Sequence, residues 1–222
     1  MANIFLFSKD HLILLLIFSM FLYICPKLTK NLLPYSYLVE KIICSLIILE
    51  IISQQLSLYY QGNYSVLTSL PIEISRFSAY ICLLILLYKQ YHLFNVFFSW
   101  SIACSLGELI LFKNPPYEFP NFSFFLYLAS KCLLIYAAVY MVEIRKFKIN
   151  KYAIRDNFIM CFICFSFIFM LNNFTLSSYP YAFSNYDLTS VLVFIIITTA
   201  TYIPIFIFKA RDLNFKFNRR SR

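Results

Sequence analysis

The run Leu12-Ile13-Leu14-Leu15-Leu16-Ile17 is apolar without interruption and decides the fold class. A membrane-spanning β-strand alternates apolar and polar residues, and this run does not alternate. Only helices and closed barrels satisfy their backbone hydrogen bonds in lipid. The run therefore predicts a helix, and we predict an all-α fold.

The composition extends this prediction to the whole chain. Hydrophobic residues make up 61% of the 222 residues and charged residues 13%, whereas soluble domains have about 25% charged residues. The mean hydropathy is +0.74. We predict one membrane domain over residues 1–208 and a basic tail over 209–222. Windows of about 20 apolar residues predict seven transmembrane helices, at 11–26, 42–60, 67–88, 92–113, 122–143, 153–172 and 188–208.

The basic residues predict the orientation of these helices. Fifteen of the 19 Lys and Arg residues fall in the tail and in the loops of one side, two (Lys9 and Lys113) on the opposite side and two inside helices. Cytoplasmic loops carry an excess of basic residues, so we predict an outside N-terminus and a cytoplasmic C-terminus. The tail then meets anionic lipid headgroups, and we favour this over nucleic-acid binding. We expect a multi-pass protein of the cell membrane, in bacteria the inner membrane.

The cysteines and histidines predict neither a metal site nor a cofactor. All seven cysteines fall in or at the ends of apolar segments, and an odd number so placed argues against a disulfide framework. Cys161 and Cys164 have the spacing of half a metal site but lie on one predicted helix without a second pair, so we favour apolar packing. His11 and His92 lie at opposite sides of the predicted membrane and cannot readily form one catalytic pair.

Five ionisable side chains lie inside the predicted helices: Glu50, Glu73, Arg76, Glu108 and Lys131. A charge at the centre of a membrane helix costs about 2.5–3.5 kcal/mol, so such groups face the inside of a bundle and pair there. With a rise of about 1.5 Å per residue, all five fall in the outer half of the bilayer. The sequence therefore predicts a polar pocket that opens outward.

Spacing predicts two pairings in this pocket. Glu73 and Arg76 are three residues apart, which lets them meet on one helix. Pro71 stands near the start of the same helix, where a missing amide hydrogen costs little. Lys131 lies at a similar depth on the fifth helix. We therefore predict an ion pair between Lys131 and Glu73, because leaving either residue unpaired costs several kcal/mol.

Further polar residues border the predicted pocket. Gln54 is four residues from Glu50 and shares its stripe, and Asn172 and Tyr179 stand close to the rim. Two interpretations stay open. The charges either neutralise each other and fix helix register, or they bind a lipid headgroup or a small polar ligand, with a basic side chain attracting an anionic group.

A family resemblance begins at Leu70-Pro71-Ile72-Glu73-Ile74-Ser75, which resembles the Leu-Pro-Leu-His-Leu-Cys signature of the YwaF-type integral membrane family. It covers roughly residues 50–200. The other matching stretches are Leu106-Gly107, Lys113-Asn114-Pro115-Pro116, Phe119-Pro120-Asn121-Phe122-Ser123-Phe124, the fifth span, Asn172 and Tyr179.

The resemblance implies a seven-helix fold that some eukaryotic relatives use for lipid acyl transfer, and that related hydrolases use on fatty-acyl esters. The reactive positions differ in this chain. Glu73 stands where the family pattern has His, Ser75 where it has Cys, and Lys131 where the fifth helix usually has His. A Cys/His mechanism therefore does not carry over.

We favour a binding or structural role over two alternatives. A lipid acyltransferase or esterase would use Ser75 as the nucleophile with Lys131 as its base, within hydrogen-bond reach. Glu73 should instead keep Lys131 charged, so we expect neither acyl transfer nor ester hydrolysis. A solute transporter component would need polar residues along the inner halves of the helices, which are nearly uncharged. Protein partners are not predicted by any feature of the sequence.

Overall fold

The computed structural model describes residues 9–31, 33–62, 64–110, 122–175, 177–182 and 186–206. As predicted, the described part is helical. In chain order its elements are α1 (Lys9–Asn31), the 3-10 turn η1 (Leu33–Tyr35), α2 (Ser36–Tyr60), α3 (Val66–Ser69), α4 (Ile74–Tyr88), the 3-10 turn η2 (Tyr91–Leu93), α5 (Phe94–Ile110), α6 (Phe122–Glu143), α7 (Ala153–Phe174) and α8 (Thr189–Ala200).

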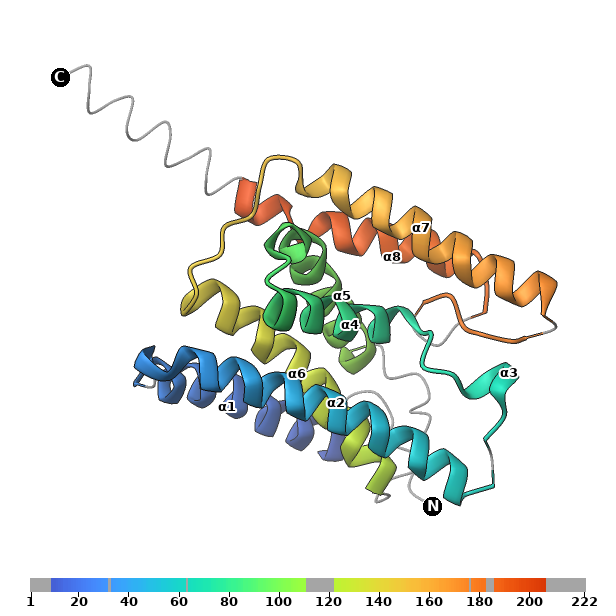
Figure 1. The fold of residues 1–222 in the computed structure, drawn as a ribbon, viewed down its shortest axis with the longest axis horizontal. Coiled ribbons are helices and arrows are strands. Elements are labelled where there is room, and N and C mark those ends of the chain that lie inside the picture. The colour runs from blue at the N-terminus through green and yellow to red at the C-terminus, as the bar shows by residue number, and fades with distance from the viewer. Residues whose placement is uncertain are drawn as a thin grey trace.

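The helices α5 and α6 form the centre of the bundle. α6 packs against α1, α2, α4 and α5, and α5 packs against α4, α6, α7 and α8. In Figure 1, α1 and α2 lie along one side of the molecule and α7 and α8 along the other. α4 contacts both α2 and α5. The fold therefore has two groups of helices, α1–α2–α6 and α5–α7–α8, joined through α4 and the contact between α5 and α6.

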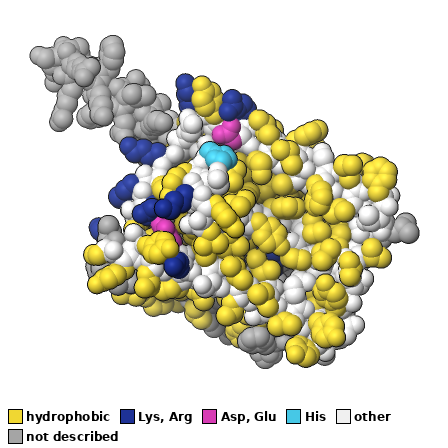
Figure 2. Space-filling view, in the orientation of Figure 1, with side chains coloured by type: hydrophobic (Ala, Val, Ile, Leu, Met, Phe, Trp, Pro, Cys, Tyr) yellow, Lys and Arg dark blue, Asp and Glu magenta, His cyan; other side chains and the backbone are white. Residues whose placement is uncertain are grey.

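The outer faces of the bundle are apolar. α7 and α8 expose large hydrophobic side chains, among them Phe162 and Leu192. Within the described residues, three segments are long and apolar enough to cross a membrane: Phe125–Glu143, Ala153–Phe174 and Thr189–Phe206. Figure 2 shows a broad hydrophobic face, with the Lys and Arg side chains gathered toward one end. These features are those of a membrane protein whose hydrophobic sides face lipid.

The observed helix bounds follow the predicted ones most closely in α6 and α7, whereas α8 (Thr189–Ala200) ends eight residues before the predicted 188–208. α6 spans the predicted residues 122–143, and α7 ends two residues beyond the predicted 153–172. α2 begins six residues before the predicted 42–60. The added turns carry polar residues that a hydropathy window leaves out.

The third predicted helix, 67–88, is not continuous. It is divided into the short α3 and the fifteen-residue α4 by an irregular segment, and Pro71 stands in that segment. A proline disfavours the helical conformation of the residue before it, and Leu70 is accordingly extended, with φ −63° and ψ 142°. The amide of Ile72 donates to the carbonyl of Leu70 at 2.8 Å. Pro71 therefore precedes α4 instead of occupying its first turn.

Candidate functional site

One buried stripe of α2 places Glu50 inside the bundle. Ile43, Ile47, Glu50 and Gln54 are all buried and recur at helical spacing. This face packs against α4 and α6. Only 6% of the Glu50 surface is exposed. Gln54 shares the stripe, as predicted from its spacing, but it does not line the cavity described below.

The irregular segment before α4 places Ser75 and Arg76 in the first turn of that helix. Glu73 is the N-cap residue, and its carbonyl accepts from the amides of Arg76 and Phe77 at 2.9 and 3.1 Å. Tyr80 donates its hydroxyl to the Pro71 carbonyl at 3.0 Å. Irregular backbone at membrane depth is tolerated where it is buried in protein or lines a cavity. The break therefore directs the start of α4 toward the interior.

Arg76 forms its ion pair with Glu50. Its Nη1 donates to Glu50 Oε2 at 2.6 Å, and both side chains are mostly buried. Two predicted contacts of Glu73 are not observed: among the ion pairs of the described residues, Glu73 joins neither Arg76 nor Lys131. Glu73 is the extended N-cap residue of α4, so it lies outside the regular helix on which the spacing prediction rests. The acidic partner of Arg76 is therefore Glu50 of α2, not Glu73.

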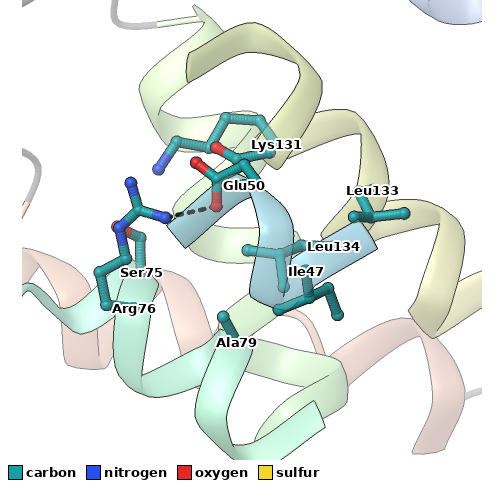
Figure 3. A pocket seen from close by; sticks show the side chains of 9 residues that line it. Ile47, Glu50, Ser75, Arg76, Ala79, Lys131, Leu133 and Leu134 are labelled. Carbon is teal, nitrogen blue, oxygen red and sulfur yellow. Dashed lines mark hydrogen bonds and ion pairs between the residues drawn. The ribbon is translucent and has the colours of Figure 1, made fainter. Parts of the chain in front are cut away.

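Lys131 enters the same region from α6. Only 3% of its surface is exposed, and its Nζ lies 4.9 Å from the centre of the Tyr127 ring, a cation–π contact. The preceding Ser130 donates to the Tyr127 carbonyl at 2.7 Å. In Figure 3, Lys131, Glu50 and Arg76 turn toward one another from three different helices. We call Glu50, Ser75, Arg76 and Lys131 the charged cluster.

The charged cluster encloses a cavity of about 10 Å³. This is about the volume that one water molecule requires. Two buried oxygen atoms belong to its lining and have no hydrogen-bond partner among the described residues: Glu50 Oε1 and Ser75 Oγ. Leaving such an atom unpaired costs about 1–3 kcal/mol. The remaining lining residues are Ile47, Ala79, Ser130, Leu133 and Leu134.

A comparison with family models identifies the chain. The model of the TMEM164 family, a membrane protein family, matches residues 6–210. The chain belongs to the TMEM164 family. No curated protein and no solved structure matches it. The coarser prediction of an integral membrane protein family is thereby confirmed, and the YwaF-type resemblance stays a prediction.

In this TMEM164 family member, Ser75 lacks the contact that a nucleophile needs. An activated serine has a base within hydrogen-bond reach, and the enzyme alternative expects that base to be Lys131. Ser75 Oγ is buried without a hydrogen-bond partner in the described part of the chain. The hydrogen bond between Ser75 and Lys131 that the enzyme alternative expects is therefore not observed among the described residues.

The seven cysteines of this family member are free thiols, five of them buried and two, Cys25 and Cys132, partly exposed. Cys161 and Cys164 are buried on α7, and Cys161 lies 3.9 Å from Asn157 Oδ1. Within the described ranges, no group of three or more His, Cys, Asp or Glu residues is arranged to hold a metal ion.

Asn172 and Tyr179 fasten a loop and do not line the cavity. Asn172 donates to the Tyr179 carbonyl at 2.9 Å and accepts from the Tyr179 amide at 2.8 Å. The Tyr179 hydroxyl donates to the carbonyl of Val66 in α3. Burial, and to a lesser extent the nearby Tyr64 phenol, raises the pKa of Tyr179. The Glu108 side chain lies outside the described part of the structure.

A second buried polar region, not predicted from the sequence, joins α5, α7 and α8. Trp100 donates to Asn157 Oδ1 at 2.8 Å, and Asn157 Nδ2 donates to Thr198 Oγ1 at 3.0 Å. Ser99 donates to the Thr198 carbonyl at 2.7 Å and accepts from Thr201 at 3.0 Å. We call these five residues the neutral network. Most of their hydrogen bonds are made to one another, and Thr198 also donates to the Ile195 carbonyl at 3.0 Å. These residues carry no charge that would have marked them in the sequence.

Proposed function

We propose that this TMEM164 family protein binds the polar head of a membrane lipid, or a small polar ligand, at the charged cluster between α2, α4 and α6. One observation carries the proposal. Glu50 Oε1 and Ser75 Oγ are buried, unpaired and part of the lining of one cavity. Buried polar atoms in proteins are normally hydrogen-bonded, so two exceptions in one cavity call for a partner.

The size of the cavity defines how a ligand enters. A volume of about 10 Å³ admits one polar heavy atom. This space lies beside the Glu50–Arg76 pair. A lipid therefore places a single polar atom in the charged cluster, while the rest of the molecule lies among apolar side chains such as those of Leu133 and Leu134.

The membrane arrangement that we propose has seven spans, formed by α1, α2, α3 with α4, α5, α6, α7 and α8, with the N-terminus outside. The gathering of Lys and Arg at one end supports this orientation. In this arrangement the basic end faces the anionic headgroups of the cytoplasmic leaflet of the cell membrane. Reporter fusions at Arg222 and near Lys9 test it, and a cytoplasmic N-terminus contradicts it.

Lipid binding is tested by native mass spectrometry of the purified full chain in nanodiscs. We expect one lipid to remain bound to the wild type at higher occupancy than to Ser75→Ala, because the variant lacks one hydrogen-bonding group of the cavity. Ser99→Ala is the matched control, since Ser99 is a buried serine of α5 in the neutral network. Equal lipid occupancy in all three proteins contradicts the proposal.

A further inference from the structure

The unpaired oxygen of Glu50 defines one requirement for the ligand. Arg76 donates to Oε2 of this carboxylate at 2.6 Å, while the buried Oε1 has no donor. A carboxylate oxygen only accepts hydrogen bonds. The entering atom must therefore carry a hydrogen that it donates to Glu50. An ether oxygen, an ester carbonyl or a quaternary ammonium group has no such hydrogen.

The unpaired oxygen of Ser75 defines a second requirement. A serine hydroxyl is one donor and can also accept, and only 3% of the Ser75 surface is exposed. In Figure 3, Ser75 lies beside the Arg76 side chain, opposite Glu50. An entering hydroxyl oxygen can donate to Glu50 Oε1 and accept from Ser75 Oγ, whereas an ammonium group would donate to both oxygens. Such an oxygen fits a cavity of about 10 Å³.

The depth of Glu50 in the proposed membrane arrangement favours neutral over charged molecules as the ligand. Glu50 stands ten residues before the end of α2 at Tyr60, which is about 15 Å along the helix axis. A charged headgroup at that depth has to leave water, and an ion loses much solvation free energy in doing so. A neutral lipid alcohol brings only its hydroxyl, and its acyl chains match the apolar surroundings.

Resting on the proposed function, we infer that the charged cluster recognises a neutral lipid of the diacylglycerol class through its free hydroxyl. The hydroxyl donates to Glu50 Oε1 and accepts from Ser75 Oγ. The proposal concerns binding alone, and no covalent step is included.

A matched pair of lipids tests the inference on the wild-type protein. Dioleoylglycerol has the free hydroxyl, and its acetate ester lacks that hydroxyl while keeping both acyl chains. Each is added to phosphatidylcholine nanodiscs that hold the full chain, and occupancy is measured by native mass spectrometry against lipid content. We expect about ten-fold tighter binding of dioleoylglycerol, because two hydrogen bonds distinguish the lipids.

Two variants test whether the preference for dioleoylglycerol arises at the cavity. Ser75→Ala loses no protein hydrogen bond and should fold normally. We expect its preference for dioleoylglycerol to fall about three-fold or more, while Ser99→Ala keeps the wild-type preference. A preference retained in Ser75→Ala overturns the inference.

The remaining outcomes separate the inference from the proposed function. If wild type binds both lipids equally well, or binds only phospholipids, and Ser75→Ala lowers that binding, the hydroxyl inference fails and the proposed function stands. If no lipid shows an occupancy that depends on Ser75, both fail and the cavity holds water only.

Discussion

The charged cluster and the neutral network both bury polar side chains between three helices, but they differ in how those side chains are satisfied. In the neutral network, Trp100, Asn157 and Thr198 are fully buried, and their side chains hydrogen-bond one another. In the charged cluster, Glu50 and Ser75 each keep a buried oxygen atom without a partner. In the described structure, the polar side chains of the first region all have hydrogen-bond partners, and those of the second region do not.

This difference separates packing from binding. A polar network whose groups are already hydrogen-bonded specifies how α5, α7 and α8 pack together. Its side chains have no donor or acceptor left for a ligand. A cluster with unpaired atoms at a cavity has hydrogen bonds left to make. The charged residues singled out in the sequence mark the proposed binding region because Glu50 still has a buried oxygen atom that can accept a hydrogen bond.

The largest expected effect comes from breaking the ion pair of the charged cluster. Glu50→Leu leaves the mostly buried Arg76 without its acid, and removing one partner of a buried pair costs about 3–5 kcal/mol. We expect a loss of stability of that size when unfolding is followed in mixed detergent micelles. The double variant Glu50→Leu with Arg76→Met should recover most of it. A loss below about 1 kcal/mol in the single variant contradicts the buried pair.

An intermediate effect is expected in the neutral network. Asn157→Leu leaves the Trp100 indole, which is only a donor, buried without an acceptor. The expected loss of stability is about 1–3 kcal/mol, measured by the same unfolding assay. Binding of dioleoylglycerol by the folded protein should be unchanged. A change in lipid preference that exceeds the change in Ser75→Ala would show that the two regions are not separate.

The smallest effect is expected from the matched serines, and it sharpens the comparison most. Ser99→Ala removes hydrogen bonds at 2.7 and 3.0 Å, which predicts a loss of about 0.5–1 kcal/mol in a membrane bundle. Ser75→Ala removes none within the described structure, so stability should be unchanged or slightly higher. The reverse order of stabilities would mean that Ser75 is satisfied in the native protein.

Apolar runs predicted most of the helices because hydropathy is a local property. Residues 122–143 became α6 with the predicted bounds, although Lys131 interrupts that run. The same averaging hid the break at Pro71, since Leu70 and Ile72 keep the window apolar. Pro71 restricts the backbone of Leu70, which could have been inferred from the sequence. The sequence prediction instead places Pro71 in the first turn of the helix, where a proline is tolerated.

The pairing inside the site could not be predicted from spacing alone. Counting residues along each helix predicted that Glu50, Arg76 and Lys131 lie at a similar depth in the membrane. The structure places the three side chains together. Which acid meets Arg76 depends on the rotation of α2 about its axis and on the position of Glu73 at a cap, both of which are set by tertiary packing. Asn157 and its partners carry no charge, so no penalty for burial distinguished them from ordinary polar residues in the sequence.

The break before α4 has a consequence for how the chain enters the membrane. α4 contains 15 residues, which is about 22 Å of helix, while the hydrocarbon core is about 30 Å thick. The helix alone is too short to cross. Its stable insertion depends on α3, on the Tyr80 hydroxyl that caps the Pro71 carbonyl, and on packing against α2 and α5. In the proposed seven-span arrangement, we therefore expect the third span to insert stably only after α5 has been synthesised.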